Sequence, residues 1–157
     1  MAHVVFSTFG SLGDVYPYVA IAERMKADGF RVSIATNYDH KSLIECAGIG
    51  FIHVQPDVAE LVTADPDTMR KAMDSRKGSE YILRNVVFGN LRNSFEDLYN
   101  ATEGVDLLVT HPLSYSAILV SRKWELPTVA TVLAPINFWS KSDPPAPPKA
   151  EWLPKLS

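Results

Sequence analysis

The segment HVVFSTFGSLGDVYP, residues 3–17, decides how this chain folds. Its first half, residues 3–9, is short, apolar and rich in Val and Phe, which predicts a fully buried strand of a parallel sheet. A turn with two glycines follows, and Pro17 stands where the first turn of a helix would begin. A buried strand that passes through such a turn into a helix is the first unit of an alternating α/β fold.

The same alternation continues on both sides of a long middle segment. Tyr18, Ile21, Ala22 and Met25 share one face of the first helix, and Gly29 is placed to end it as a left-handed cap. The further expected elements are strands at residues 31–36, 51–54, 105–110 and 127–132 and helices at residues 39–47 and 112–124. We therefore predict an α/β, Rossmann-like parallel sheet of about five strands in the order 3-2-1-4-5, flanked by helices.

The middle segment, residues 56–104, interrupts this alternation because it is polar and charged and contains no convincing strand. We expect two helical stretches here. The second has an apolar stripe with helical spacing, formed by Leu83, Val87, Leu91, Phe95 and Leu98. The proline-rich residues 143–148 fit neither a helix nor a central strand, and we expect an extended surface segment.

Composition restricts the class of protein. The 157 residues amount to one domain, and a net charge of −3 without a basic run argues against a nucleic-acid partner. Cys46 is the only cysteine, so an internal disulfide and a thiolate metal cluster are excluded; we expect it to be buried on a helix. We see no signal peptide and no apolar run long enough to span a membrane, which favours a cytoplasmic protein.

The turn after the first strand is the expected functional centre. With the order 3-2-1-4-5, the crevice that binds ligands lies between strands one and four, so residues 10–17 border it. The dinucleotide fingerprint G-x-G-x-x-G is absent, and the acidic Asp14 would repel a pyrophosphate. Asp14 has two interpretations at this stage: the N-cap of the helix, or a general base at the mouth of the crevice.

Residues 10–17, the helix after them and the second strand resemble the N-terminal domain of GT-B glycosyltransferases. The similarity is greatest to the group with sterol glucosyltransferases, rhamnolipid-type rhamnosyltransferases and antibiotic glycosyltransferases. A second set of motifs supports it: His111-Pro112-Leu113, Trp124-Glu125-Leu126-Pro127, Ala134-Pro135 and Asp143-Pro144-Pro145. The resemblance is strong at both ends of the chain and weak through residues 56–104, where such families adapt to different acceptors.

This resemblance implies an inverting hexosyltransferase that moves a sugar from a nucleotide-diphosphate donor to a hydroxyl of a lipid or natural product. Asp14 occupies the position of the general base. His111, directly after Thr110 at the end of strand four, is a candidate proton partner of Asp14; a structural histidine at a strand end is the alternative. Ser11, with Gly10 and Gly13, is a candidate contact for the donor's phosphate or sugar.

The resemblance also implies an acceptor cleft. Asn137, Phe138 and Trp139 are candidates to line it, with ordinary packing as the alternative. Met69, Met73, Phe88 and Phe95 could form an apolar acceptor pocket, but packing in the core is the commoner role of such residues. His40 and His53 share no metal-ligand spacing with His111, so we expect no protein-bound metal and no cofactor beyond the donor substrate.

The implied division of labour leaves residues 1–157 as an N-terminal, acceptor-side domain that is truncated. Its partners would be the acceptor and a C-terminal domain in cis that binds the nucleotide sugar, so the fragment alone should be inactive. Contact with a membrane surface is a further option. A different class of function is also open: a non-catalytic half that binds acceptor or membrane and recruits a separate donor-binding subunit.

Overall fold

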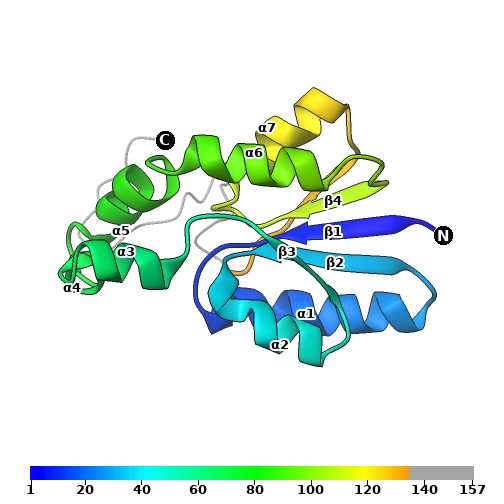
Figure 1. Ribbon diagram of the computed structural model, residues 1–157, viewed down its shortest axis with the longest axis horizontal. Coiled ribbons are helices and arrows are strands. Elements are labelled where there is room, and N and C mark those ends of the chain that lie inside the picture. The colour runs from blue at the N-terminus through cyan, green and yellow to red at the C-terminus, as the bar shows by residue number, and fades with distance from the viewer. Residues whose placement is uncertain (135–157) are drawn as a thin grey trace, which may run out of the picture.

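The computed structural model describes residues 1–134 and has a five-stranded, fully parallel sheet at its centre (Figure 1). The strands are β1 (His3–Ser7), β2 (Arg31–Thr36), β3 (Gly50–His53), β4 (Leu107–Thr110) and β5 (Thr128–Ala130). Their order is β3-β2-β1-β4-β5, so the predicted order 3-2-1-4-5 is confirmed. The predicted extended segment at residues 143–148 and the candidates Asn137, Phe138 and Trp139 lie outside the described residues.

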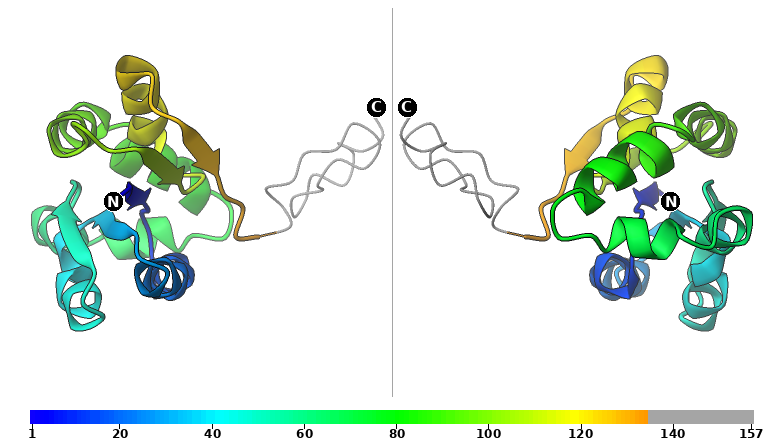
Figure 2. Two further views of the ribbon diagram at one scale, coloured as in Figure 1. Left: turned by 90° about the vertical axis from the view of Figure 1, so that its right-hand side faces the viewer. Right: turned by 90° about the vertical axis from the view of Figure 1, so that its left-hand side faces the viewer.

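Helices cover both faces of the sheet, as the end-on views of Figure 2 show. On one face lie α1 (Leu12–Ala27), the 3₁₀ turn η1 (Tyr38–His40) and α2 (Lys41–Cys46); on the other lie α6 (Leu91–Ala101) and α7 (Tyr115–Trp124). Successive side chains of β1 point to opposite faces of the sheet, and each set contributes to the apolar cluster under one layer of helices. Val4 and Phe6 belong to the apolar cluster under α1, whereas Val5 belongs to the cluster under α6 and α7.

The helix α1 begins five residues earlier than its predicted start at Pro17. Leu12 is its first residue, so Pro17 lies inside the helix rather than in its first turn. At its other end, Gly29 has a φ of 91°, and the amides of Gly29 and Phe30 donate to the carbonyls of Lys26 and Met25. This pair of bonds is the Schellman arrangement, which confirms the predicted left-handed cap.

The middle segment contains no strand among the described residues, as predicted, but its helices are shorter and more numerous than expected. They are α3 (Val58–Ala64), α4 (Thr68–Ala72), α5 (Gly78–Tyr81), the π-helix η2 (Ile82–Val87) and α6. The stripe from Leu83 to Leu98 is therefore divided between η2 and α6 rather than carried by one helix. The helices α3, α4 and α5 lie beyond the sheet on one side, whereas α6 packs over it (Figure 1).

The structure contradicts the predicted burial of four side chains and one predicted helix start. Met69, Met73 and Phe88 are 52%, 80% and 47% exposed, so the core-packing interpretation fails for them. Cys46, expected to be buried, is exposed at the last residue of α2. The helix α7 also starts at Tyr115, after the turn that contains Pro112, rather than at Pro112 itself.

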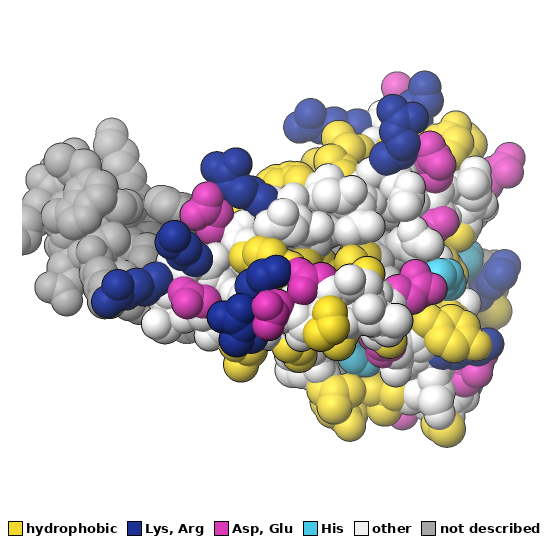
Figure 3. Space-filling view, turned by 60° about the vertical axis from the view of Figure 1, so that its left-hand side comes forward, with side chains coloured by type: hydrophobic (Ala, Val, Ile, Leu, Met, Phe, Trp, Pro, Cys, Tyr) yellow, Lys and Arg dark blue, Asp and Glu magenta, His cyan; other side chains and the backbone are white. Residues whose placement is uncertain are grey.

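Charge is mixed on the surface. On the face that Figure 3 shows, basic and acidic side chains of the described residues are interspersed, and the basic ones form no continuous patch. Several pair with an acidic residue three or four positions away, for example Arg84 of η2 with Glu80 of α5 at 2.9 Å. Within residues 1–134, no helix has the length and apolar character needed to cross a membrane.

Candidate functional site

The candidate site lies where the loops that follow β1, β2 and β4 meet at the carboxyl edge of the sheet. β1 pairs with both β2 and β4, so the chain reverses its direction of winding on the two sides of β1. Backbone bonds join the loops: the amide of Thr8 donates to Ala35, and the amide of His111 donates to Ser7 at 2.9 Å. Asp14, Ser11, Gly10 and His111 are thereby brought together, as the sequence predicted.

Asp14 is the third residue of α1, and its carboxylate folds back onto the start of the helix. Oδ2 accepts hydrogen bonds from the Ser11 amide at 2.8 Å and from the Ser11 hydroxyl at 3.0 Å. Ser11 is therefore the N-cap, and the alternative interpretation of Asp14 as the N-cap was wrong. The Thr8 hydroxyl adds a bond to the Asp14 backbone carbonyl at 2.9 Å, which ties the first turn of α1 to the end of β1.

Gly10 makes room for this carboxylate. Its φ is 134°, a conformation that side chains rarely adopt, and a Cβ placed there would lie 2.8 Å from Asp14 Cγ. Gly13 is a helical residue of α1. A Cβ placed on it would lie 3.5 Å from Ser11 Oγ, an ordinary contact distance, so packing in the described residues does not require a glycine there.

His111 faces the second oxygen of Asp14. Its Nε2 lies 3.6 Å from Asp14 Oδ1, which is too long for a hydrogen bond but close enough for a direct electrostatic interaction. The amide of Leu113 donates to Nδ1 at 3.2 Å, so the lone pair is on Nδ1 and the neutral ring carries its proton on Nε2, facing Asp14.

Burial controls the charge of this histidine. The His111 side chain is only 5% exposed, whereas the Asp14 side chain is 35% exposed. Loss of hydration lowers the pKa of His111 below its ordinary value, and the nearby Asp14 charge opposes this effect without overcoming it. The pair therefore consists of a solvent-accessible carboxylate and a buried, neutral N–H that points toward it.

His40 is a member of this site that sequence reasoning missed. Its Nε2 lies 3.1 Å from the Gly10 carbonyl oxygen, and its side chain is buried between the ends of β1 and β2. The available signal was its place four residues after the end of β2, where a side chain can reach the neighbouring loop. His53 pairs instead with Asp57 at 2.9 Å. The described residues contain no group of three metal-ligating side chains.

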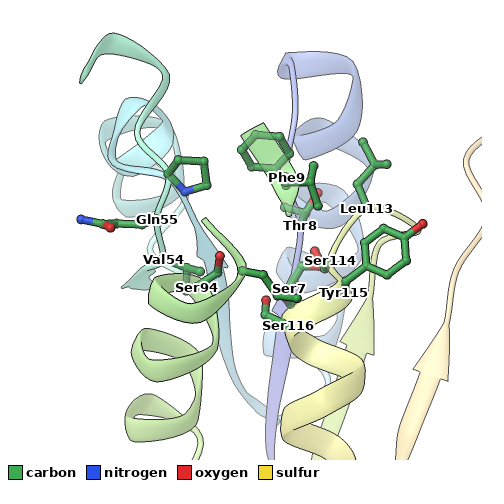
Figure 4. Close-up of a pocket in the computed structure, with 13 residues that line it drawn as sticks. Ser7, Thr8, Phe9, Val54, Gln55, Ser94, Leu113, Ser114, Tyr115 and Ser116 are labelled. Carbon is green, nitrogen blue, oxygen red and sulfur yellow. The ribbon is translucent and has the colours of Figure 1, made fainter. Parts of the chain in front are cut away.

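A small pocket opens beside this site, on the face of the sheet that α6 and α7 cover (Figure 4). Its free space is about 30 Å³, which suits ordered water rather than a whole organic ligand. Phe9 lies at one end of the pocket and Ser7 and Ser116 at the other, while Gln55 and Tyr115 lie on opposite sides. Other lining residues are Thr8, Val54, Pro56, Val87, Leu91, Ser94, Leu113 and Ser114.

One aromatic pair flanks this pocket. Phe88, expected in a core or an acceptor pocket, packs at an angle against Tyr115, with ring centroids 5.0 Å apart and the ring planes tilted by 47°. Phe95 stacks on Tyr99 at 5.5 Å and borders a shallow surface groove with Leu119 rather than the pocket. Phe88 thus packs against a pocket-lining residue, and Phe95 packs against the cluster under α6 and α7, whereas Met69 and Met73 belong to the separate helix α4 and its C-cap.

Comparisons with known proteins agree on one kind of enzyme. Residues 4–95 match the glycosyltransferase family 28 N-terminal domain. A sterol 3-beta-glucosyltransferase of Gibberella zeae is 32% identical over 123 residues, which cover 76% of this chain and 8% of that protein. One of Cryptococcus neoformans is 33% identical over 120 residues, covering 76% of this chain and 7% of that protein.

Solved structures show the same fold. The Streptomyces sp. SF2575 glycosyltransferase SsfS6 superposes with a TM-score of 0.64 at 17% identity, covering 83% of this chain and 39% of that one. The glycosyltransferase SnogD from Streptomyces nogalater has a TM-score of 0.60 at 23% identity, covering 87% and 35%. The chain thus spans less than a tenth of these two curated relatives and well under half of the two solved structures.

Proposed function

This chain belongs to the family of the glycosyltransferase family 28 N-terminal domain, and from that premise we propose that it is the acceptor-side domain of an inverting hexosyltransferase. The donor is a nucleotide-diphosphate sugar, held mainly by a C-terminal domain in cis. The acceptor is a hydroxyl of a lipid or natural product. A sterol is the first acceptor to assay, because the two curated relatives described above are sterol 3-beta-glucosyltransferases. A lipid acceptor would be reached by contact with a membrane surface.

The observation that carries the proposal is that the two carboxylate oxygens of Asp14 have different partners. Oδ2 is engaged by two hydrogen bonds from Ser11, which fix the orientation of the group. Within residues 1–134, Oδ1 accepts no hydrogen bond; it faces His111 Nε2 at 3.6 Å, and the side chain as a whole is 35% exposed. A partly exposed carboxylate that is held in one orientation, with one oxygen outside these hydrogen bonds, is suited to accept a proton from a bound hydroxyl.

The reaction then runs in one displacement. The acceptor oxygen forms a bond to the anomeric carbon while the bond from that carbon to the donor's phosphate oxygen breaks. The diphosphate departs with the bonding electron pair, and the acceptor proton passes to Asp14 Oδ1. His111, neutral with its proton on Nε2, interacts with the Asp14 charge before the transfer and keeps Oδ1 directed at the site.

The role proposed for the start of α1 is donor contact by Gly10, Ser11 and Gly13. In support, the first amides of a helix lack intrahelical partners and favour a negatively charged ligand. The Ser11 hydroxyl and amide already donate to Asp14, so Ser11 would have to exchange its hydroxyl bond to reach a phosphate. The 30 Å³ pocket accepts only one end of the acceptor, whose remainder would lie outside it.

Replacing Asp14 with Asn in the full-length enzyme tests the proposal. Asn keeps the size of the side chain and can still accept from Ser11, but it cannot take a proton, so kcat should fall about 10²–10⁴-fold. Asp28→Asn is the matched control, because Asp28 is an exposed carboxylate at the other end of the same helix. Unchanged turnover in Asp14→Asn would remove Asp14 from the role of base.

A further inference from the structure

The peptide group between Gly10 and Ser11 is bonded at both of its polar atoms. Its carbonyl oxygen, on Gly10, lies 3.1 Å from His40 Nε2. Its amide, on Ser11, donates to Asp14 Oδ2 at 2.8 Å. A carbonyl can only accept, so His40 must carry its proton on Nε2 in this arrangement. The three groups thus form a chain from His40 through one peptide to Asp14.

The planar peptide bond couples the directions of the two hydrogen bonds that it makes. The carbonyl and the amide of one peptide bond lie in the same plane and point in opposite directions. A donor that fixes the Gly10 carbonyl therefore also fixes the direction of the Ser11 amide. Hydrogen bonds in such a chain also polarise one another, which strengthens each by about 10–30%.

His40 is well placed to act as a fixed donor. It is 8% exposed and ends the 3₁₀ turn η1 between β2 and α2. Gly10 has a φ of 134° and no side chain that could restrain this peptide. Without a contact from another residue, the peptide would be free to rotate. The restraint comes instead from His40, which belongs to a different strand–helix connection.

We propose that His40 is a positioning residue for sugar transfer, which holds the Gly10–Ser11 peptide so that its amide orients the Asp14 carboxylate. This inference rests on the proposed function, because it assigns His40 an effect on the base rather than on substrate. It predicts that the donor atom of His40 matters more than the volume of its ring.

Two substitutions in the full-length enzyme separate these properties. His40→Leu removes the donor and keeps an apolar side chain, and it should lower kcat about three- to tenfold, the effect of losing one hydrogen bond. The KM values for donor and acceptor should stay within about twofold, because neither substrate touches His40 in this proposal. His40→Gln, which carries an amide donor on a chain long enough to reach the Gly10 carbonyl, should restore kcat to near the wild-type value.

A double substitution tests whether His40 acts through Asp14. In an Asp14→Asn background, His40→Leu should cause no further loss, because the residue it positions is no longer a base. His3→Leu serves as the control, since His3 lies at the opposite edge of the sheet and contacts Ser33. If His40→Leu does not fold, His40→Asn replaces it, because the shorter Asn amide cannot reach the carbonyl and should give the same fall in kcat.

The outcomes distinguish this inference from the proposed function. Full turnover in Asp14→Asn would refute the general base and, with it, this inference. Loss of turnover in Asp14→Asn with normal kcat in His40→Leu would refute the role of His40 alone. A fall that Gln does not restore, or that persists undiminished in the Asp14→Asn background, would show that His40 acts elsewhere and would also overturn the inference.

Discussion

At the scale of single residues, the start of α1 combines a structural and a chemical task in one side chain. A carboxylate at the third position of a helix that accepts from the N-cap is a common stabilising device. Here the hydrogen bonds from Ser11 engage only Oδ2 of Asp14, and Oδ1 faces His111. For the base that we propose, the helix start supplies the rigidity that a proton acceptor needs, and loosening it should reduce turnover before it unfolds the domain.

Gly10→Ala provides a direct test of that rigidity. The substitution places a Cβ against the Asp14 carboxylate, and alanine at a φ of 134° adds backbone strain of about 1–3 kcal/mol. We expect a lower Tm and a fall in kcat of at least tenfold. Gly29→Ala is the matched control, because Gly29 also has a positive φ, of 91°, but a Cβ there meets open space. Gly29→Ala should lower Tm and leave kcat unchanged; an equal loss of kcat in both variants would contradict the steric explanation.

His111 should make stability depend on pH in a defined direction. Burial lowers the folded-state pKa of His111 below its ordinary value of 6.5, so at mildly acidic pH the unfolded chain binds a proton that the folded chain does not. The free energy of unfolding should therefore fall as the pH drops below about 6.5 and be fully recovered above it. Comparing thermal unfolding of wild type and His111→Gln at pH 5 and pH 7.5 measures this effect. His3, whose pKa is also lowered, contributes to both proteins and cancels in the difference. The prediction fails if the stability of wild type and of His111→Gln depends on pH in the same way.

At the scale of elements, the sequence predicted the sheet and missed where helices begin. Apolar runs and their separation define the central strands well, because β1, β2 and β4 are largely buried on both faces. The predicted start of α1 is wrong because proline favours the first turn of a helix but also occurs further along, as Pro17 does here. The Ser11-x-x-Asp14 spacing is a capping-box pattern, and it places the first helical residue correctly at Leu12. His40 could not be predicted as part of the site, because its contact with Gly10 joins residues that are 30 positions apart.

In the middle segment, the helical spacing of apolar residues did not predict where one helix ends and the next begins. A stripe with helical spacing assumes constant winding, but η2 is a π-helix, in which Phe88 bonds back to the Leu83 carbonyl at 2.8 Å. The wider turn changes the direction in which later side chains point, and α6 starts as a new helix at Leu91. Leu98, a residue of α6, is nevertheless fully buried, as its place in the stripe predicted.

Leu98 tests how much α6 contributes to the fold. The side chain is 0% exposed in the cluster between the sheet, α6 and α7, so Leu98→Ala should reduce the free energy of unfolding by about 2–5 kcal/mol. Met73→Ala, at a residue that is 80% exposed, should change it by no more than about 0.5 kcal/mol. Thermal unfolding of both variants measures the contrast. A small effect at Leu98 would mean that α6 adjusts to fill the space.

At the scale of the whole molecule, one residue connects the base that we propose with the pocket. Thr8 joins the two regions, because it lines the pocket and its hydroxyl donates to the Asp14 backbone carbonyl. An acceptor that enters from the pocket would extend past this link to present its hydroxyl to Oδ1. The donor would approach the same edge of the sheet from the other half of the enzyme, so changes in the pocket should affect one substrate and not the other.

Ser116→Val tests this separation of substrates. Ser116 is 5% exposed at the start of α7, and the added methyl groups would occupy part of a pocket that holds only about 30 Å³. Because a misfit of one methyl group changes discrimination about 10–200-fold, we expect the KM for the acceptor to rise at least tenfold or the preferred acceptor to change. The KM for the nucleotide sugar should stay constant. Ser121→Val, on the same helix but outside the pocket, controls for the loss of a buried hydroxyl. A rise in both KM values would show that the pocket shapes the donor site too, and unchanged values would place the acceptor on another surface of the domain.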